Sequence, residues 1–360
     1  MHNWRGKTAA AMILVLVVQA LVALVDVSLG QELVPGVMIF GDSVVDAGNN
    51  NDLLTIVKAN FPPYGRDFVQ HKATGRFCNG KLATDLTVEN LGFTSYPPAY
   101  LSNEATGNKL LKGANFASAA SGYLDSTANL YVSRAISLNQ QLRYYKDYQS
   151  KVESIVGKAK ATNLFSGAIY VLSAGNSDYI QNYYINPVLS GSYTTDQFSD
   201  LLVQSFTSFI QNVYSLGARR IGVTSLPPMG CLPAAINLFG GGSNACVTRL
   251  NDDAVAFNKK INVAAQTLKK SHPDLKLVVF DIYKPLLDLI NNPEKNGFFE
   301  SRRACCATGT VETSLLCNAR APGTCSNATG YIFWDSFHPS EAANKVLADA
   351  LLIQGIDLIA

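Results

Sequence analysis

Short apolar runs alternate with longer amphipathic stretches along the chain. The runs that predict β-strands are Val37–Phe40, a weaker run near Phe93–Tyr96, Ala114–Ala119, Ala168–Ser173, Arg220–Ser225 and Leu275–Asp281. The stretches with a helical period are about Lys81–Leu91, Ile136–Lys158, Thr195–Leu216, Val247–Ser271 and Ser340–Gln354. Because this alternation is typical of a parallel sheet with helices on both faces, we predict an α/β fold with a doubly wound parallel sheet.

The same pattern predicts one domain over residues 31–360, since no internal repeat and no low-complexity linker interrupts it. Three long segments rich in Gly, Pro, Asn or Cys stand out, at Tyr179–Thr195, Pro227–Asn244 and Asn291–Tyr331. Long connections of this kind are usually functional, so we expect them to surround a site.

Residues 1–30 predict a secretory signal peptide. Arg5 and Lys7 precede an apolar run from about Ala9 to Val25, and Ser28–Gly30 supplies small residues of the kind that a signal peptidase reads. The alternative is an N-terminal membrane anchor, because this run is longer than most signal-peptide cores. Since no later stretch is long and apolar enough to span a bilayer, we expect a soluble mature chain outside the cytoplasm with no stable membrane insertion.

Composition and charge narrow the range of partners. The 360 residues are 48% hydrophobic and 16% charged, which is enough for a sizeable core and too little charge for a disordered chain. The formal net charge is only +2, and no basic patch or stripe is visible. We therefore expect no nucleic-acid partner.

Cysteine usage agrees with an oxidising compartment. Six of the seven cysteines fall into two local groups, Cys231 with Cys246, and Cys305, Cys306, Cys317 with Cys325. Closeness in sequence favours a Cys231–Cys246 bridge and two bridges that join the adjacent pair to Cys317 and Cys325, in an order that the sequence leaves open. A zinc site is not expected, because the spacing is not of the paired C-x-x-C type. Cys78 is left over as a candidate buried thiol.

One N-x-[ST] acceptor occurs, at Asn327-Ala328-Thr329. In a secreted protein such a tripeptide predicts a glycan on a surface loop.

The stretch "VMIFGDSVVDAGNN", Val37–Asn50, places Ser43 directly after the first predicted strand. Ligands of doubly wound sheets bind outside the carboxyl ends of the strands, so Ser43 is a candidate nucleophile. We expect a helix to begin there, whose dipole would favour a developing oxyanion. The alternative is that Ser43 only caps that helix, since Ser and Asp are ordinary N-cap residues.

A serine nucleophile needs a base, and the chain has four histidines, of which His2 lies in the predicted signal peptide. His71 lies in a polar stretch, and His272 follows a Lys-rich helix end. His338 differs, because Asp335 precedes it by three residues and aromatic residues flank it. A carboxylate so close can orient one imidazole nitrogen and leave the other free to accept a proton. We therefore expect His338 and Asp335 to act with Ser43.

Two further predicted strand ends offer donors for an oxyanion. "GANFASAASGY" ends its run of small residues at Gly122, where a missing side chain lets a backbone N–H approach a substrate. "AIYVLSAGNSDY" ends at Gly175-Asn176-Ser177-Asp178. Each segment alone is often only a tight turn, but together they place several polar groups at the strand ends of one sheet.

These motifs, in this order and spacing, resemble the plant GDSL-type esterases/lipases of the SGNH-hydrolase superfamily over nearly all of the chain after residue 30. The first block of that family is matched by "FGDSVVDAGNN", the second by "GANFASAASG", the third by "SAGNSDY" and the fifth by "FWDSFHP". "GCLP" and "RRACCATG" also fit the plant branch.

The resemblance implies a flavodoxin-like three-layer α/β/α domain with about five core strands, and secreted carboxylic-ester hydrolysis without a metal or other cofactor. Its substrate would be an acyl lipid or another acylated ester, and its location the cell wall or apoplast. It implies Ser43 as nucleophile, His338 as base and acid, and Asp335 as the residue that orients His338. The Ser43 and Gly122 backbone N–H groups would donate to the oxyanion.

The third block departs from the family pattern Gly-x-Asn-Asp, because Ser177 stands where the oxyanion Asn is expected. A serine hydroxyl is shorter, and Asn176 is the alternative donor. Since loss of one donor typically lowers the rate by ~10²–10³, a weakly active cell-wall binding protein stays open as an alternative to an ester hydrolase. A second alternative is an acyltransferase to a polymer or sugar hydroxyl, which would use the same residues.

Overall fold

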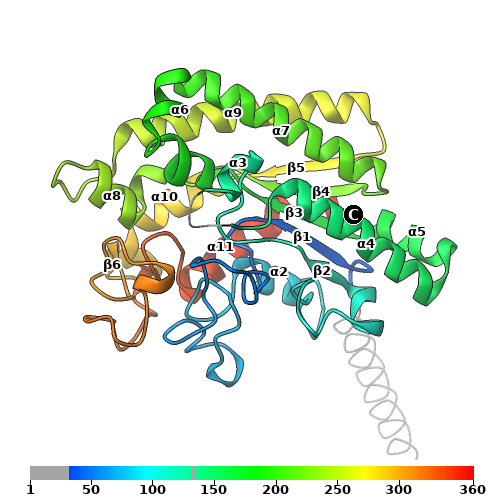
Figure 1. Ribbon diagram of the computed structural model, residues 1–360, viewed down its shortest axis with the longest axis horizontal. Coiled ribbons are helices and arrows are strands. Elements are labelled where there is room, and N and C mark those ends of the chain that lie inside the picture. The colour runs from blue at the N-terminus through cyan, green and yellow to red at the C-terminus, as the bar shows by residue number, and fades with distance from the viewer. Residues whose placement is uncertain (1–31, 131–133) are drawn as a thin grey trace, which may run out of the picture.

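The computed structural model describes residues 32–130 and 134–360, so the predicted signal peptide lies outside the described residues. Five parallel strands form the central sheet, namely β1 (Val37–Gly41), β2 (Gly113–Asn115), β3 (Ile169–Ser173), β4 (Arg220–Thr224) and β5 (Lys276–Phe280). Their order is β2-β1-β3-β4-β5, which is the flavodoxin-like order with its switch point between β1 and β3. The predicted α/β fold with a doubly wound parallel sheet is confirmed (Figure 1).

Five helices lie where the apolar period predicts them, within about two residues at each end. They are α2 (Ala83–Asn90), α4 (Leu138–Val156), α7 (Thr195–Ser215), α9 (Thr248–Ser271) and α11 (Glu341–Gln354). Helices that the pattern does not predict are α3 (Asp125–Ala128), α5 (Lys158–Gly167), α6 (Pro187–Ser192), α8 (Pro233–Phe239), α10 (Tyr283–Asn291) and α12 (Ile356–Ile359).

The long connections contain local structure of their own. A small parallel pair, β6 (Glu300–Ala304) and β7 (Tyr331–Phe333), lies within and at the end of the cysteine-rich segment. Short 3₁₀ segments are η1 (Val69–His71), η2 (Gly107–Lys112), η4 (Met229–Cys231), η5 (Pro293–Asn296) and η6 (Ser314–Leu316), and η3 (Asp178–Tyr183) is a short π-helix. The chain therefore supports its long loops with short elements and disulfides.

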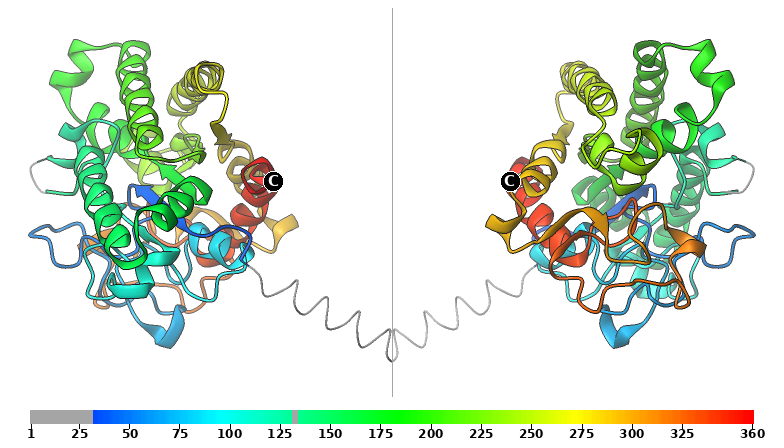
Figure 2. Two further views of the ribbon diagram at one scale, coloured as in Figure 1. Left: turned by 90° about the vertical axis from the view of Figure 1, so that its right-hand side faces the viewer. Right: turned by 90° about the vertical axis from the view of Figure 1, so that its left-hand side faces the viewer.

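One face of the sheet carries large side chains. Alternate strand residues point to the same face, and on this face they include Met38, Phe40, Tyr170 and Leu172, all buried in the main hydrophobic cluster. That cluster continues into α4, α7 and α9. Figure 2 shows α4 and the C-terminal α11 on opposite sides of β1.

The other face carries smaller side chains and a separate hydrophobic cluster. Its residues include Val37, Ile39 and Ile169, which pack toward α2, α11 and α12 through side chains such as Val88 and Leu358. The two faces of the sheet therefore differ in the size of their side chains.

Two details of the strand prediction are wrong. Phe93–Tyr96 forms no strand. The strand expected over Ala114–Ala119 is shorter and shifted, at Gly113–Asn115, although the N–H groups of Phe116 and Ser118 still donate to the carbonyls of β1. In the part of the chain that the structure describes, no helix combines the length and apolar character needed to cross a bilayer.

Candidate active site

Ser43 follows the carboxyl end of β1, and Gly41 makes this position possible. Gly41 has φ 135°, and a Cβ atom there would lie 1.9 Å from the Ser173 carbonyl oxygen of β3. Only glycine allows this close approach. The buried Gln141 side chain holds the same residue from α4, with its Oε1 2.9 Å from the Gly41 N and its Nε2 2.9 Å from the Gly41 O.

The helix expected at Ser43 does not form, so a helix dipole does not act there. Residues after β1 form consecutive turns, and the Val45 N–H donates to the Asp42 carbonyl at 3.3 Å. The Asp42 side chain accepts from the Val44 N–H, which satisfies that donor within the turn. Ser43 is therefore not a helix cap.

The structure brings Ser43, His338 and Asp335 together. His338 Nε2 lies 2.7 Å from Ser43 Oγ, and His338 Nδ1 lies 2.6 Å from Asp335 Oδ1. His338 and Asp335 come from the turn between β7 and α11, where Ser340 caps the helix. An ionised Asp335 accepts from the Nδ1–H, so Nε2 is left to accept from the serine hydroxyl.

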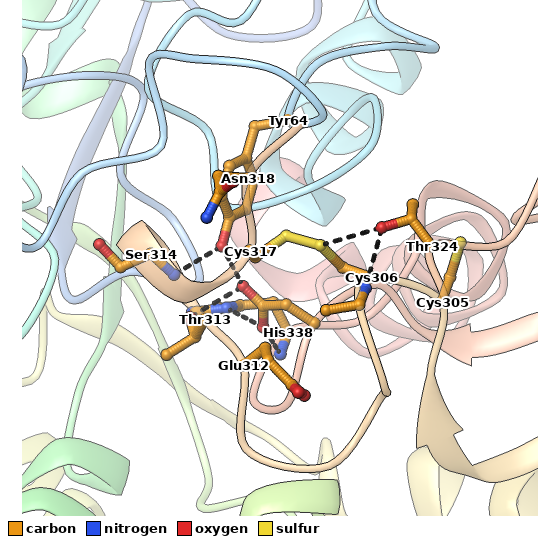
Figure 3. Close-up of a disulfide and its surroundings, with 12 residues drawn as sticks. Tyr64, Cys305, Cys306, Glu312, Thr313, Ser314, Cys317, Asn318, Thr324 and His338 are labelled. Carbon is orange, nitrogen blue, oxygen red and sulfur yellow. Dashed lines mark hydrogen bonds and ion pairs between the residues drawn. A yellow bond between two sulfur atoms is a disulfide. The ribbon is translucent and has the colours of Figure 1, made fainter. Parts of the chain in front are cut away.

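Both oxygens of Asp335 are occupied. Oδ1 also accepts from the His338 N–H at 3.0 Å. Oδ2 accepts from the Tyr64 hydroxyl at 2.7 Å and from the Thr313 hydroxyl at 2.9 Å. Tyr64 in turn accepts from the Ser314 N–H at 2.8 Å, and Figure 3 shows these groups beside the Cys306–Cys317 disulfide.

The hydrogen bonds and the neighbouring charge together determine the charge of Asp335. Burial acts to raise the pKa of Asp335, but the neighbouring His338 charge and the hydrogen bonds from His338 and Tyr64 outweigh it and hold the pKa below its usual value. Burial and the Asp335 charge raise the pKa of Tyr64 well above its ordinary value. Tyr64 therefore keeps its proton and donates a hydrogen bond to a charged carboxylate.

Two backbone N–H groups are free to bind an oxyanion. Within residues 32–130 and 134–360, the N–H groups of Ser43 and Gly122 donate to no protein acceptor. Gly122 lies seven residues past β2 in a loop, rather than at the strand end. A Cβ atom on Gly122 would lie 2.5 Å from the Asp178 carboxylate, so this position also requires glycine.

Asp178 of the third block supports the Gly122 loop. Its carboxylate accepts from the N–H groups of Tyr123 at 2.7 Å and Leu124 at 3.1 Å, and from the Thr127 hydroxyl at 2.6 Å. Burial raises the pKa of Asp178 to about 6. The aspartate therefore acts on the site through the loop that carries Gly122.

The polar residues of "DAGNN" bind the second-block loop to the first. Asp46 Oδ2 accepts from the Ala119 N–H at 2.9 Å, while Asn49 Nδ2 donates to the Ala117 carbonyl at 2.7 Å. Asn50 Nδ2 donates to the Ala119 carbonyl at 3.1 Å. These side chains fix the path of the chain from β2 toward Gly122.

Ser177 and Asn176 occupy different surroundings at the end of β3. Ser177 is 2% exposed, and its hydroxyl makes no hydrogen bond with any described residue. Asn176 is half-buried and lines a cavity beside Asp42, with its Oδ1 atom buried and without a partner. Neither side chain is committed to another protein group.

The cysteines form three disulfides, Cys231–Cys246, Cys305–Cys325 and Cys306–Cys317. This pairing supplies the order that the sequence left open. Cys78 is a buried free thiol.

The predicted glycan acceptor is accessible. Asn327 is exposed, and its Oδ1 accepts from the Thr329 N–H and hydroxyl. Its glycosylation stays a prediction.

The other described histidines do not reach the site. His71 is exposed, and His272 ends α9 against Tyr214. Among the residues with a described position, no three His, Cys, Asp or Glu side chains gather as metal ligands would.

Sequence reasoning missed Tyr64, Thr313 and Gln141. Tyr64 is 271 residues away from Asp335 in the sequence, and nothing in "FPPYGRDF" indicates a link to that carboxylate. Gln141 lies on the apolar face of a predicted helix, and a buried amide on such a face is the one signal that could have been followed.

A family model described as GDSL-like Lipase/Acylhydrolase matches residues 37–351. The chain is 66% identical to the GDSL esterase/lipase At5g03820 of Arabidopsis thaliana, over 92% of this chain and 94% of that protein. It is 63% identical to the GDSL esterase/lipase At5g22810 of the same plant, over 91% of each chain. The GDSL esterase/lipase APG of Arabidopsis thaliana is 60% identical, over 96% of this chain and 98% of that protein.

Proposed function

This chain belongs to the GDSL-like lipase/acylhydrolase family and is a carboxylic ester hydrolase, and on that premise we propose that it works through an acyl-enzyme on Ser43. The observation that carries the proposal is the unbroken hydrogen-bonded series from Ser43 through His338 to Asp335. Such a series activates a hydroxyl that is otherwise a weak nucleophile.

In the first half of the reaction, Ser43 Oγ attacks the ester carbonyl carbon while His338 Nε2 takes the hydroxyl proton. Asp335 stabilises the imidazolium that results. The carbonyl oxygen becomes an oxyanion, which the N–H groups of Ser43 and Gly122 stabilise. When the tetrahedral intermediate collapses, the ester C–O bond breaks and His338 gives its proton to the leaving alcohol.

In the second half, water attacks the acyl carbon and His338 takes its proton. Collapse of the second intermediate breaks the bond to Ser43 Oγ, returns the proton to the serine and releases the carboxylic acid. Ser177 is the third oxyanion donor in this scheme, with Asn176 as the alternative. An alcohol in place of water would make the same residues an acyltransferase, so product analysis with and without an added alcohol separates the two reactions.

We place the mature protein outside the cell, in the cell wall or apoplast. Three disulfides fit an oxidising compartment. The exposed Asn327 sequon and the apolar N-terminal run are the sequence features that support this location.

A fluorophosphonate probe tests the nucleophile directly. We expect the probe to label the folded protein at Ser43, and we expect Ser43→Ala to lose both the label and the hydrolysis of a short-chain aryl ester. Ser190→Ala, at an exposed serine of α6, is the matched control and should keep both. Labelling that persists in Ser43→Ala, mapped to another residue by peptide analysis, would contradict the proposal.

A further inference from the structure

One buried amide touches both of the loops that carry the oxyanion N–H groups. Gln141 is 0% exposed and lies on the buried face of α4, whose other buried side chains are Leu, Tyr or Val. Its Oε1 accepts from the Gly41 N–H at 2.9 Å, and its Nε2 lies 2.9 Å from the Gly41 carbonyl oxygen. Since Gly41 precedes Ser43 by two residues, this pair of hydrogen bonds holds the loop of the nucleophile.

The same nitrogen also reaches the loop that carries Gly122. Nε2 of Gln141 lies 3.2 Å from the hydroxyl of Ser121, the residue directly before Gly122. It also lies 3.1 Å from the carbonyl oxygen of Ile136, which comes just before α4. One side chain therefore joins the two loops to each other and to the start of the helix.

The turn before the second N–H group has a backbone conformation that needs such support. Ala120 has φ 67°, in the left-handed region that residues other than glycine rarely adopt. A conformation of this kind persists only where the surrounding contacts hold it. The Ser121 N–H donates to the Ser118 carbonyl at 3.0 Å, and the Ser118 N–H donates to the Gly41 carbonyl at 3.0 Å. Because this carbonyl also lies within hydrogen-bond distance of Gln141, the amide holds the turn against the end of β1.

The position of Gln141 on α4 gives the amide a fixed base. It lies one turn after the N-cap Ser137, whose hydroxyl accepts from the Gln140 N–H. Tyr145 and Tyr148, one and two turns further along, are fully buried in the main hydrophobic cluster. A side chain on an anchored helix is held more precisely than a side chain on a loop.

We propose that Gln141 is a positioning residue for ester hydrolysis, which sets the separation of the Ser43 and Gly122 N–H groups. The inference rests on the proposed function, because it takes these two groups as the oxyanion donors. The hydrogen bonds of Gln141 go to neither Ser43 nor His338, so it acts through the two loops. Oxyanion donors are effective when they are fixed in advance where the charge develops, and a displacement of about 1 Å can lower the rate by about 10²-fold.

The first test removes the amide and keeps its size. Gln141→Met retains an unbranched side chain of similar helix propensity. For p-nitrophenyl acetate we expect kcat and kcat/KM to fall together by about 30-fold, with KM within about twofold of wild type, because the lost interaction supports only the transition state.

Gln149→Met is the matched control on the same helix. Gln149 lies about two turns further along α4, and its Nε2 donates to the Leu216 carbonyl at 2.7 Å, at the opposite edge of the sheet. We expect this variant to lose stability toward urea and to keep the kcat and KM of the wild type.

An inhibitor that forms a tetrahedral adduct separates positioning from a purely structural role. Ser43 Oγ adds to the carbonyl carbon of an alkyl trifluoromethyl ketone while His338 takes its proton, and the ketone oxygen becomes the oxyanion. We expect the inhibition constant to rise in Gln141→Met by the factor by which kcat/KM falls, and to stay unchanged in Gln149→Met.

Gln141→Glu is a second variant with the shape of the native side chain. Burial keeps its carboxyl group protonated, so it offers an acceptor to the Gly41 N–H and one donor. We expect its kcat to lie between the values of wild type and Gln141→Met, with the affinity for the ketone reduced in proportion. This variant carries the test if Gln141→Met does not fold, which near-UV circular dichroism shows.

The outcomes separate this inference from the proposed function. Turnover that persists in Ser43→Ala would contradict both. If turnover depends on Ser43 and the Gln141 variants have the kinetics of Gln149→Met, the role of Gln141 alone is overturned. A fall in kcat without the matching loss of ketone affinity would also overturn it, and would leave Gln141 as a structural amide of the core.

Discussion

Asp335 carries a full set of hydrogen bonds without contact with solvent. It is 0% exposed, and five donors from Tyr64, Thr313, Phe337 and His338 share its two oxygens. A buried carboxylate stays charged only when such partners replace water. The two hydroxyl groups therefore determine how firmly the carboxylate is placed and how strongly it attracts the imidazole proton.

Tyr64→Phe should expose this dependence. The substitution keeps the ring, which contacts Phe77 and Trp334, and removes only the hydroxyl. We expect kcat/KM to fall by about tenfold, roughly the ~1.5 kcal/mol of a hydrogen bond to a charged group. A carboxylate with fewer donors holds a proton more strongly, so the Asp335–His338 pair stays protonated to a higher pH. The acid limb of the pH–rate profile should therefore move to higher pH.

Tyr148→Phe is the matched control for this change. The Tyr148 hydroxyl is also buried and donates to the Leu110 carbonyl at 2.7 Å, but on the far side of the main core. Its loss should lower the free energy of unfolding and leave the pH profile in place. If Tyr64→Phe behaves in the same way as Tyr148→Phe, Tyr64 has only a structural role.

Among the elements near the site, the loop closed by the Cys306–Cys317 disulfide supplies Thr313 and Ser314. The neighbouring Cys305–Cys325 disulfide also leaves the end of β6, but its additional residues, 318–325, give Asp335 no donor. The two bridges therefore differ in what they hold, although they begin at adjacent cysteines.

Removing the inner bridge should affect both stability and activity. We expect the double variant Cys306→Ser with Cys317→Ser to lose about 3 kcal/mol in the free energy of unfolding, from the loop-closure entropy of a short loop. We also expect kcat/KM to fall at least tenfold, because Thr313 and Ser314 are no longer held. Urea unfolding and ester hydrolysis measure the two effects.

The outer bridge provides the comparison. Cys305→Ser with Cys325→Ser should lose a similar free energy of unfolding and keep most of its kcat/KM, since the inner bridge still holds Thr313. Equal losses of activity in the two double variants would show that the segment acts as one unit.

The elements also show what the sequence could predict. Four of the five core strands and the helices α2, α4, α7, α9 and α11 follow from the apolar period, because each buries one continuous face, whereas β2 is shorter than its apolar run. The helix expected after β1 is wrong for a local reason. The side chains of Asp42 and Asp46 accept from the N–H groups of Val44, Gly48 and Asn49, so these donors are satisfied in turns and need no helix.

The small β6–β7 pair could not be predicted in the same way. Glu300–Ala304 reads "ESRRA" and has no apolar alternation. It becomes a strand because β7 lies beside it and two disulfides leave its end. Pairing between distant segments decides this element, and a single sequence carries no signal for it.

At the scale of the whole molecule, the candidate site was partly predictable. Few histidines were available, so His338 and Asp335 could be selected with Ser43 before any distance was known. The role of Tyr64 and the cavity beside Asp42 could not be predicted from the sequence, because each depends on which residues meet across the fold. The difference between the two faces of the sheet also arises from strand register, which places Val171 beside Gly222.

Three buried aspartates couple the stability of the whole fold to pH. Burial raises the pKa of Asp42 to about 7, and the pKa values of Asp46 and Asp178 to about 6, above the unfolded value of 3.8. A carboxyl group with a raised pKa in the folded state contributes stability that is fully present below the unfolded pKa and is lost as pH rises through the folded pKa. All three groups therefore favour the folded state in mild acid.

The contribution of Asp335 to stability changes with pH in the opposite direction, but it does so in a different pH range. Its folded pKa lies below 3.8, so its contribution is present above that pH and is lost only in stronger acid. The range between about pH 4 and pH 7 is thus governed by the three raised aspartates together with the half-buried Glu341, whose pKa burial also raises. We expect the free energy of unfolding, measured with urea, to be larger at about pH 5 than at about pH 8.

Asp42→Asn isolates the largest of these contributions. The amide cannot ionise, and it can still accept from the Val44 N–H. A shift of about three pKa units corresponds to at most ~4 kcal/mol of unfolding free energy, so the variant should lose a substantial part of the difference between acid and neutral pH. Asp52→Asn, at an exposed position nearby, should leave that difference unchanged. A wild-type protein that is more stable at about pH 8 than at about pH 5 would mean that Asp42 is held ionised in the fold.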